Sequence, residues 1–506
     1  MKKAMKKLMA ALLAVAMVCA MAIPAFAEGA GAAGTGAAGT GTAAAGTTYT
    51  ITIKDPVGTY EAYQIFSGDL EGNVLSNIAW GSGISEAGKT ALGDAKTKAK
   101  DLTESNVKDF AEEVSSYLAT PSGTYAAGKI TGLSAGYYLV KNSSVGDHET
   151  YTSFILKVVK NVEVSPKGNK PTLEKKVKDI NDTTDSTTSN WQDSADHDID
   201  DEVPFQLTAT IASNFADYKT YKFVFHDVQS AGLDFLKDTV TVKVGNTELT
   251  DDQYEVITTG LTDDCTFHVV IEDLKQIRSA AADAKVVVEY KSKLNKNAVI
   301  GSKGNPNEAY LEYSNNPYDT NGTTTTPHDK VTVFTFKVVA NKIDGATDEA
   351  LPGAAFALYK KDKAGNWNLV ALNNATESNG VYNIVDNKKT TFEWEGLDDG
   401  DYKISEVITP AGYNTIDDQI FTVTADHDVL AADPKLTSLS GNPETGAIQF
   451  SSDKDKGSLS TTIENNRGTT LPGTGGIGTT IFYVVGGGLM VAAAVLLITK
   501  KRMENR

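Results

Sequence analysis

The stretch VFTFKVVANK at residues 333–342 alternates side chains so that Phe334, Phe336, Val338, Ala340 and Lys342 share one face. A period of two is typical of a β-strand with one buried face. Similar short segments recur along the chain, separated by turns rich in Gly, Asn and Asp: TYTITI (48–53), YYLVKN (137–142), YKFVFHD (221–227), KVVVEY (285–290) and YKISEV (402–407). The pattern predicts a mainly β protein made of immunoglobulin-like β-sandwiches joined end to end.

The chain has 506 residues, several times the size of a typical domain. Polar, Pro-rich or Asp-rich joints at 166–171 and 322–329 divide its body into expected domains at 48–168, 169–330 and 331–468. Two helices are expected in the first domain, at 83–102 and 105–119, with Ser105 as the N-cap of the second.

The N-terminus predicts secretion. Residues 1–27 have a basic head, an apolar run and an A-x-A end, which is the pattern of a signal peptide cleaved after Ala27. Residues 28–47 contain little but Gly, Ala and Thr, so they form a low-complexity leader without side chains for a core.

The C-terminus carries three features in a fixed order. The first is the pentapeptide Leu471, Pro472, Gly473, Thr474 and Gly475, which resembles the LPxTG sorting signal of Gram-positive surface proteins. An uncharged apolar stretch follows at 477–499, long enough for a transmembrane helix, and then a basic cytoplasmic tail at 500–506. The resemblance implies that a sortase cysteine cuts between Thr474 and Gly475 and holds Thr474 as an acyl-enzyme.

Charge and composition exclude several classes of function. The signal peptide, residues 1–27, carries +4 and the segment after Thr474 carries +3, so the net charge of −18 becomes −25 for residues 28–474. This negative charge disfavours nucleic acid as a partner. Cys265 is the only cysteine after the signal, so no intrachain disulfide can form. The six histidines show no paired spacing typical of metal ligands, and no catalytic motif is present. We therefore expect that the protein binds no metal and no cofactor and is not an enzyme. The acidic runs at 198–202 and 453–456 are expected to be solvated.

Three further segments carry a family resemblance. They are TYEAYQIFSGD (59–69), the region 201–235 that begins DEVPFQLTATI, and LPGAAFALYKK (351–361) together with YKISEVITPAGY (402–413). In this order they resemble the sortase-assembled major pilins of Gram-positive bacteria, of the SpaA/FimA type. The resemblance implies an N-terminal pilin domain, a middle Cna-like domain and a C-terminal prealbumin-like domain. It also implies that the protein forms a pilus on the cell wall. Its expected partners are other copies of the chain, a pilin sortase, a housekeeping sortase and peptidoglycan, together with minor or tip pilins and a host surface.

The family's pilin motif presents the lysine that receives the next subunit. VEVSPKG at 162–168 is similar to it, which implies Lys167 as the acceptor, although Ser165, Gly168 and Val158 replace the family's tyrosine, asparagine and tryptophan. Lys170 is the competing acceptor.

The family also closes its sandwiches with a Lys–Asn isopeptide bond formed beside a buried acid. In the third domain, parity places Lys342, Asn465 and the acid Glu406 on inward faces with their apolar neighbours. YKISEVITPAGY departs from the family's glutamate motif at Val407 and Thr409 but keeps Glu406.

In the middle domain the expected acid is Asp227, which alternates with Tyr221, Phe223 and Phe225. Parity prefers Lys175 over Lys176, and Asn315 over Asn316, although a bulge would reverse the choice of lysine. In the first domain Lys54 is out of phase with Ile51 and Ile53, so we expect it to face water and expect no crosslink there.

A monomeric wall-anchored adhesin is the competing interpretation, because it would use the same leader, domains and sorting signal. The acceptor lysine separates the two, since only a pilin needs it.

Overall fold

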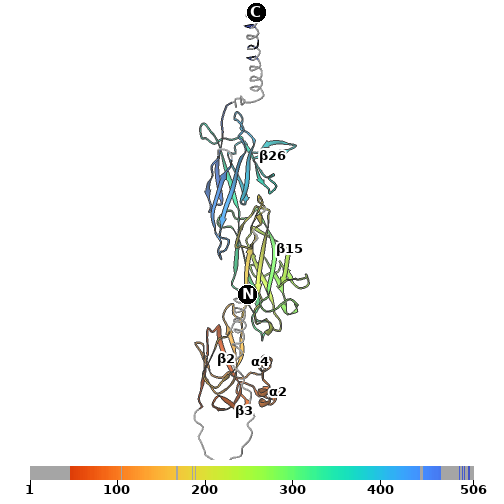
Figure 1. Cartoon of the computed structure of the whole chain (residues 1–506), viewed down its shortest axis with the longest axis vertical. Coiled ribbons are helices and arrows are strands. Elements are labelled where there is room, and N and C mark those ends of the chain that lie inside the picture. The colour runs from red at the N-terminus through yellow and green to blue at the C-terminus, as the bar shows by residue number, and fades with distance from the viewer. Residues whose placement is uncertain are drawn as a thin grey trace, which may run out of the picture.

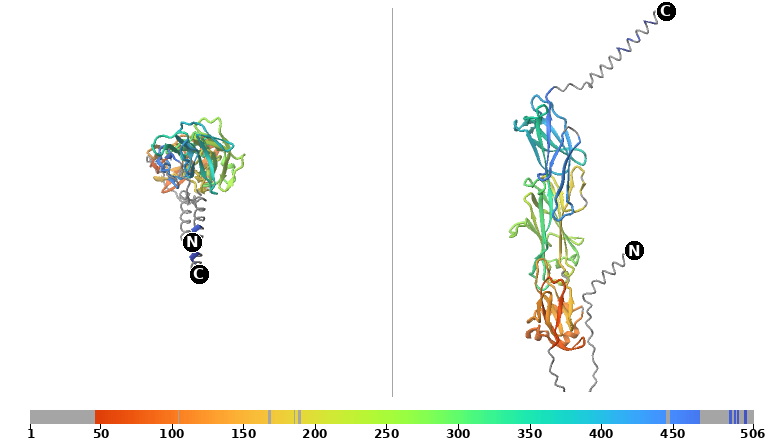
Figure 2. Two further views of the ribbon diagram at one scale, coloured as in Figure 1. Left: turned by 90° about the horizontal axis from the view of Figure 1, so that it is seen from above. Right: turned by 90° about the vertical axis from the view of Figure 1, so that its left-hand side faces the viewer.

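The computed structural model describes residues 46–103, 105–166, 169–184, 186–187, 190–444 and 448–468, with 489, 490, 493, 495, 500 and 501. The signal peptide, nearly all of the leader, the sorting pentapeptide and most of 477–506 lie outside these residues. Three β units follow one another along the long axis, and a view turned by 90° shows the same row (Figures 1 and 2). Among the residues described, no helix is long and apolar enough to cross a membrane.

The first unit packs one β-sheet against a second sheet on one side and against helices on the other. The sheets have the strand orders β4-β5-β1-β8 and β3-β2-β6-β7. Their elements are β1 Tyr49–Ile53, β2 Gly58–Glu71, β3 Val74–Trp80, α2 Glu86–Leu92, α3 Ala95–Asp101, α4 Val107–Ser115, β4 Thr124–Ala126, β5 Lys129–Leu133, β6 Gly136–Val145, β7 Ser153–Val158 and β8 Val162–Val164.

The middle unit is a sandwich of two larger sheets, β16-β15-β19-β13-β9 and β12-β22-β20-β14-β18-β17, with β21 added beside β20. Its elements are β9 Thr172–Val177, β10 Ile180–Asn181, β11 Ser186–Thr187, β12 Ser194–Asp196, β13 Glu202–Thr210, η1 Phe215–Asp217, β14 Phe223–Gln229, β15 Leu233–Val244, β16 Thr247–Glu248, β17 Glu255–Ile257, β18 Phe267–Ile271, η2 Leu274–Gln276, β19 Lys285–Leu294, β20 Asn305–Ser314, β21 Thr323–Thr325 and β22 Asp329–Phe334.

The third unit pairs the sheet β28-β23-β33-β32 with the sheet β25-β24-β29-β30-β31. Its elements are β23 Phe336–Asp344, β24 Ala355–Lys361, β25 Trp367–Asn373, β26 Ala375–Ser378, β27 Val381–Ile384, β28 Thr391–Leu397, β29 Gly400–Ile408, β30 Gln419–His427, β31 Leu436–Pro443, β32 Ser451–Asp453 and β33 Ser458–Asn465. The mainly β class predicted from the sequence is confirmed.

Strand alternation builds each core. On β23, Phe336, Val338 and Ala340 are at most 1% exposed, and they pack with apolar side chains of the opposite sheet. Burying such a side chain contributes roughly 1.5–3 kcal/mol, so one apolar face per strand is enough to hold two sheets together.

One strand joins the cores of two units. Phe334 ends β22, which pairs with β20 and β12 of the middle unit, yet its side chain packs in the core of the third unit. The middle unit's sheet therefore runs past the expected boundary at residue 330.

The helices of the first unit are shorter than expected. The segment 83–102 is two helices, α2 and α3, because Gly93 takes a φ of 81° and Asp94 then caps α3 by accepting from the backbone N–H of Thr97 at 2.8 Å. The expectation that Ser105 caps the next helix is wrong. Asn106 occupies the N-cap position of α4, and its carboxamide oxygen accepts instead from the N–H of Thr103.

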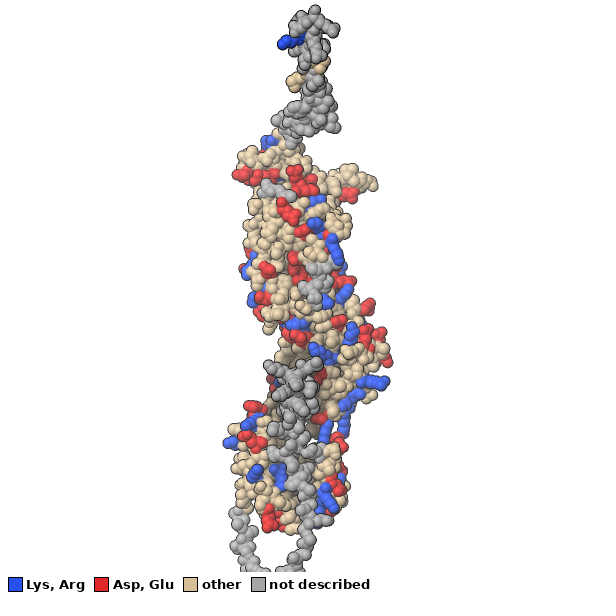
Figure 3. All heavy atoms as spheres, viewed as in Figure 1, with Lys and Arg blue, Asp and Glu red and all other residues tan. Residues whose placement is uncertain are grey.

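Charged side chains of both signs lie along the visible face of the three units (Figure 3). Of the two acidic runs expected to be solvated, the one at 453–456 is largely exposed. The expectation is wrong for Asp198 in the other run, because its carboxylate accepts from buried Lys360 Nζ at 2.6 Å.

Candidate functional site

The third unit brings a lysine, an asparagine and a glutamate together inside its sandwich. Lys342 lies on β23 and Asn465 on β33, two neighbouring parallel strands, and Glu406 reaches them from β29 of the opposite sheet. Lys342 is 1% exposed and Asn465 is fully buried. The Asn465 side-chain amide donates to Glu406 Oε2 at 3.1 Å. The same oxygen accepts hydrogen bonds from Thr409 Oγ1 at 3.0 Å and from the Ile416 N–H at 3.2 Å.

The electrostatics of this group favour a reactive amine. Burial lowers the pKa of Lys342 to about 8, although the negative charge of Glu406 opposes the shift. Among the described residues, Lys342 Nζ donates to two backbone carbonyls, those of Ile343 and Ile463 at 3.1 and 3.0 Å. Asn465 Oδ1 is buried and accepts no hydrogen bond from the described residues. An amine with a lowered pKa can lose its proton, and a carbonyl without a donor remains open to attack or to polarisation by an acid.

The middle unit holds a second group of the same chemistry. Lys175, on β9, is fully buried, and its Nζ donates to Asp227 Oδ2 at 2.5 Å and to the Tyr290 hydroxyl at 3.0 Å. The Tyr290 hydroxyl donates to the same carboxylate oxygen at 2.7 Å. Burial lowers the pKa of Lys175 against the opposing charge of Asp227. The alternative lysine, Lys176, points outward and forms ion pairs with Asp193 and Glu174.

The asparagine beside Lys175 and Asp227 is Asn307. It is fully buried, its amide donates to the Tyr290 hydroxyl at 3.0 Å, and its Oδ1 accepts no hydrogen bond from the described residues. Its strand, β20, runs antiparallel to β14, which pairs Asp227 with Ala309 and Gln229 with Asn307. Tyr290 therefore links the amine, the carboxylate and the amide in one buried network.

The expectation that Asn315 lies beside Lys175 is wrong. Asn315 follows the end of β20, six positions beyond the residue that faces Asp227, or about 20 Å along a strand. Its side-chain amide donates to the backbone carbonyl of Glu149 at 3.4 Å. Its backbone carbonyl accepts from the N–H of Tyr151 at 2.8 Å. Asn315 therefore belongs to the joint between the first and middle units, and Asn316, the other candidate, is adjacent to it.

The described residues of the first unit include no comparable group of buried lysine, asparagine and acid. Lys54 faces water as expected, with a side chain 55% exposed and an ion pair to Glu163 at 2.6 Å. In the part of this unit that the structure describes, none of the lysines is fully buried.

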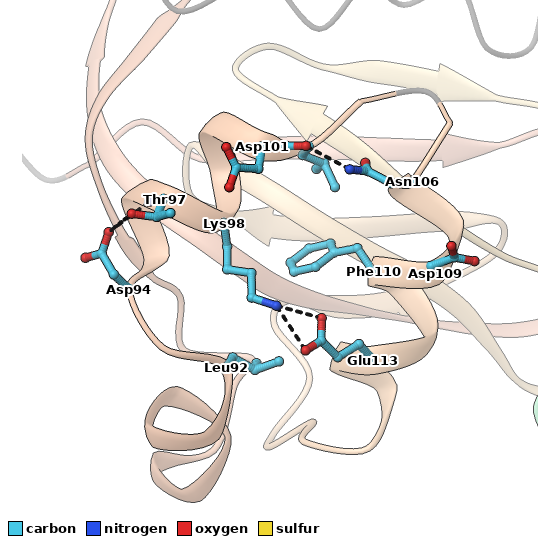
Figure 4. Close-up of a pocket in the computed structure, with 10 residues that line it drawn as sticks. Leu92, Asp94, Thr97, Lys98, Asp101, Asn106, Asp109, Phe110 and Glu113 are labelled. Carbon is cyan, nitrogen blue, oxygen red and sulfur yellow. Dashed lines mark hydrogen bonds and ion pairs between the residues drawn. The ribbon is translucent and has the colours of Figure 1, made fainter.

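A surface hollow of about 610 Å³ lies between α3 and α4 of the first unit. Lys98 reaches across it to the carboxylate of Glu113, at 2.9 and 3.0 Å, beside the ring of Phe110 (Figure 4). At the other end of the hollow, Asp94 accepts from both the N–H and the hydroxyl of Thr97 at 2.8 Å, which is the N-cap arrangement of α3 described above.

Sequence reasoning missed the polar joint between the middle and third units. Lys360 donates to Asp198 at 2.6 Å, to Asp182 at 3.1 Å and also to Asp398, which is fully buried. Burial would lower the pKa of Lys360, but the three carboxylates outweigh it and raise the pKa. Removing one partner of such a buried pair costs several kcal/mol, so these charges fix how the two units meet.

Lys167, Gly168 and all five residues of the sorting pentapeptide, Thr474 included, lie outside the described residues. Their neighbours are described: β8 ends at Val164 and β9 begins at Thr172. Lys167 is thus in the connection between the first two units. Its competitor Lys170 forms an ion pair with Glu149 at 2.7 Å.

Comparison with known proteins assigns the middle and third units and the C-terminus. Residues 199–317 match the family model of the Gram-positive pilin backbone subunit 2, Cna-B-like domain. Residues 336–435 match the prealbumin-like fold domain, and residues 463–505 match the LPXTG cell wall anchor motif. The chain belongs to the Gram-positive backbone pilins. The family predicted from the sequence is confirmed.

One curated relative and one solved structure are similar to this chain, and the structure shows a shared fold. The trypsin-resistant surface T6 protein of Streptococcus pyogenes serotype M6 is 23% identical over 411 residues, which cover 72% of this pilin and 70% of the relative. The solved T6 backbone pilin of the same serotype has a TM-score of 0.53 at 19% identity, covering 83% of this chain and 98% of that one. The pilin is a major subunit of a sortase-assembled pilus and is anchored in the cell wall of a Gram-positive bacterium.

Proposed function

We propose that copies of this pilin join head to tail through the Thr474 carbonyl carbon and Lys167 Nζ of the next copy. A sortase thiol attacks the Thr474 carbonyl, the Thr474–Gly475 bond breaks, and residues 475–506 leave with a free amine on Gly475. The neutral amine of Lys167 then attacks the thioester, so that an amide forms and the sortase thiol is released. A head-to-tail link does not close on itself, so repetition gives a fibre.

The position of Lys167 in the chain supports this choice. It follows Pro166 in the sequence, whose ring fixes the backbone φ angle, and it comes after the last residue of β8 and before the first residue of β9. The amine of Lys170 is engaged with Glu149, but a surface ion pair contributes at most about 1 kcal/mol, so it would not prevent reaction. Lys170 therefore remains the alternative acceptor.

Lys167→Arg is the test, because arginine keeps the positive charge but is not a nucleophile. In cells that carry the sortase, we expect immunoblots of wall extracts to lose their ladder of high-mass species and to retain a single anchored band. Lys170→Arg, the matched control, should keep the ladder. A ladder that persists in Lys167→Arg and disappears in Lys170→Arg would move the acceptor to Lys170. A single band for the unaltered pilin would favour the monomeric adhesin.

We also propose that the terminal subunit is transferred to peptidoglycan by a housekeeping sortase and that its partners include minor or tip pilins and a host surface. The pilin has no catalytic turnover in this scheme. It serves as the substrate of the sortases and of its own internal reactions.

Each of the two buried groups is proposed to form one intramolecular amide. In the third unit the neutral Lys342 Nζ attacks Asn465 Cγ, the bond from Cγ to the amide nitrogen breaks, and ammonia leaves. Glu406 supplies a proton to the Asn465 side chain and takes the proton that the amine loses. In the middle unit Lys175, Asn307 and Asp227 have the same roles, and the Tyr290 hydroxyl positions all three.

The observation that carries this proposal is the middle group, where one hydroxyl contacts a buried amine, a buried carboxylate and a buried amide within 3.0 Å. Burying a charged amine without reaction would be costly, and an amide bond removes that charge. Two crosslinks should lower the intact mass of the secreted chain by about 34 Da relative to its composition, because each condensation releases one ammonia. An intact mass without this deficit would exclude both bonds and leave the polymerisation proposal standing.

A further inference from the structure

Four potential metal ligands meet on the outer face of the middle unit. His226 of β14 and His268 of β18 are paired with each other on two neighbouring antiparallel strands, and their ring centroids are 4.0 Å apart. The connection that enters β18 brings Asp263 and Cys265 over the same two rings. One donor atom from each of the four residues lies within 4.8 Å of the other three.

The donor atoms point toward a common centre. His226 Nδ1 lies 2.9 Å from Asp263 Oδ2, and His268 Nε2 lies 2.9 Å from the same oxygen. Cys265 Sγ lies 3.7 Å from His226 Nδ1. Four ligands at zinc bond lengths on a tetrahedron are roughly 3.3–3.8 Å apart. The sulfur–nitrogen distance already lies in this range, and the two nitrogen–oxygen distances would have to lengthen by a few tenths of an ångström.

We propose that His226, His268, Asp263 and Cys265 form a Zn²⁺ site. Two imidazoles, a thiolate and a carboxylate are the ligand types that zinc accepts in closed four-coordinate sites, whereas calcium and magnesium prefer oxygen alone. As the sulfur–zinc bond forms, the Cys265 thiol gives one proton to water. Bound in this way, zinc would hold the connection before β18 against the sheet.

The surroundings of the four ligands support a built site. His226 Nε2 lies 3.3 Å from Glu312 Oε2, so a hydrogen donated to Glu312 leaves the lone pair of Nδ1 facing the centre. Tyr310 stacks on the His226 ring at 4.4 Å, and its hydroxyl donates to Asp263 Oδ2 at 3.3 Å. A carboxylate behind a ligating histidine is the usual arrangement of outer groups in zinc proteins. The Asp263 side chain is about one third exposed, so an ion would enter the site from the side on which Asp263 lies.

The site is separate from the proposed crosslink. Asp227 follows His226 on β14, and consecutive residues of a strand face opposite sides of the sheet. Histidine spacing gave no sign of the site, because His226 and His268 meet only through strand pairing.

Cobalt titration of the whole secreted chain, without a histidine tag, tests the proposal. Co²⁺ replaces Zn²⁺ in such sites, and tetrahedral thiolate coordination gives visible d–d bands together with a thiolate-to-cobalt charge-transfer band. Because Cys265 is the only cysteine after the signal peptide, a charge-transfer band can arise only from this residue. We expect one equivalent of Co²⁺ to give both bands and Zn²⁺ to abolish them.

Three variants and one control sharpen the result. Cys265→Ser should lose the charge-transfer band, His268→Ala should weaken zinc binding at least tenfold, and Glu312→Gln should weaken it about 10- to 100-fold while every ligand remains. His427→Gln is the control, because His427 belongs to a separate cluster with Asp179 and Asp196 and should leave the spectrum unchanged.

A measurement on the unaltered chain guards against variants that fail to fold. Stoichiometric Zn²⁺ should slow alkylation of Cys265 by iodoacetamide at least tenfold, as read from intact mass. Alkylation at the same rate with and without zinc, or a cobalt spectrum without a charge-transfer band, would overturn the proposal.

Discussion

Replacing Asn307 by alanine should leave the middle unit without its internal bond. Asn307 would supply the carbon that Lys175 attacks, so Asn307→Ala should raise the intact mass by about 17 Da beyond the change in composition. Lys175→Met, which removes the amine and keeps an apolar chain of similar length, should abolish the same deficit.

The expected loss of stability follows from the length of the closed loop. The bond between residues 175 and 307 closes a loop of about 130 residues, and by analogy with disulfides such a loop removes about 5 kcal/mol of unfolded-state entropy. For a unit of this size, each kcal/mol corresponds to roughly 2–4 °C, so the melting temperature of the middle unit should fall by about 10–20 °C.

Intact-mass measurement and differential scanning calorimetry check the two parts separately. Asn315→Ala is the matched control, because Asn315 has the same parity as Asn307 and its side-chain amide donates to the Glu149 carbonyl of the first unit. It should leave the mass deficit unchanged. The reasoning from strand register would be refuted if Asn315→Ala abolished the deficit and Asn307→Ala did not.

Three further predictions concern the third unit and its joint. Glu406→Ala should leave only the middle crosslink, restoring about 17 Da, and should lower the melting temperature of the third unit alone, because the two sites lie in separate cores. In Asn465→Ala no crosslink forms, and burial keeps the pKa of Lys342 in the folded state at about 8, below its ordinary 10.5. Between pH 8 and 10.5 the unfolded chain therefore binds a proton that the folded chain does not, so the free energy of unfolding should rise by roughly 3 kcal/mol over this range. A thermal-denaturation profile that does not change with pH would contradict this. Burial opposes the charge of His427, but Asp179 and Asp196 outweigh it and raise its pKa to about 9. Its contribution to the joint is therefore complete below pH 6.5 and lost as the pH rises through 9; protease cleavage at the joint should increase over that range, and His427→Gln should remove the dependence.

The sequence could predict what depends on local alternation. Period-two patterns are set within a single strand, and they gave the inward direction of Lys175, Lys342 and Asn465 correctly. The order of strands, helices and sorting signal along the chain could also be predicted, because it follows from the local composition of each segment.

Features that depend on pairing between strands could not be predicted in this way. Asn307 lies on β20 and Asn315 just beyond its end, with the same parity, and only the register of β20 against β14 distinguishes them. The expected solvation of Asp198 failed for a related reason, since it is the third unit that supplies Lys360. The ligands on β14 and β18 likewise come together only after the sheet has formed.

The parallel pairing of β23 with β33 has a mechanical consequence. In a fibre under tension, the third unit is pulled at the start of β23, near Phe336, and at the end of β33, near Asn465. Two adjacent parallel strands pulled from these opposite ends slide past each other, so all the hydrogen bonds between them resist together and none is opened one by one from an edge. A bond from Lys342 to Asn465 would carry the force directly from one strand to the other. The residues between 342 and 465 would then bear almost none of it, and the rest of the sandwich could vary in sequence without weakening the fibre.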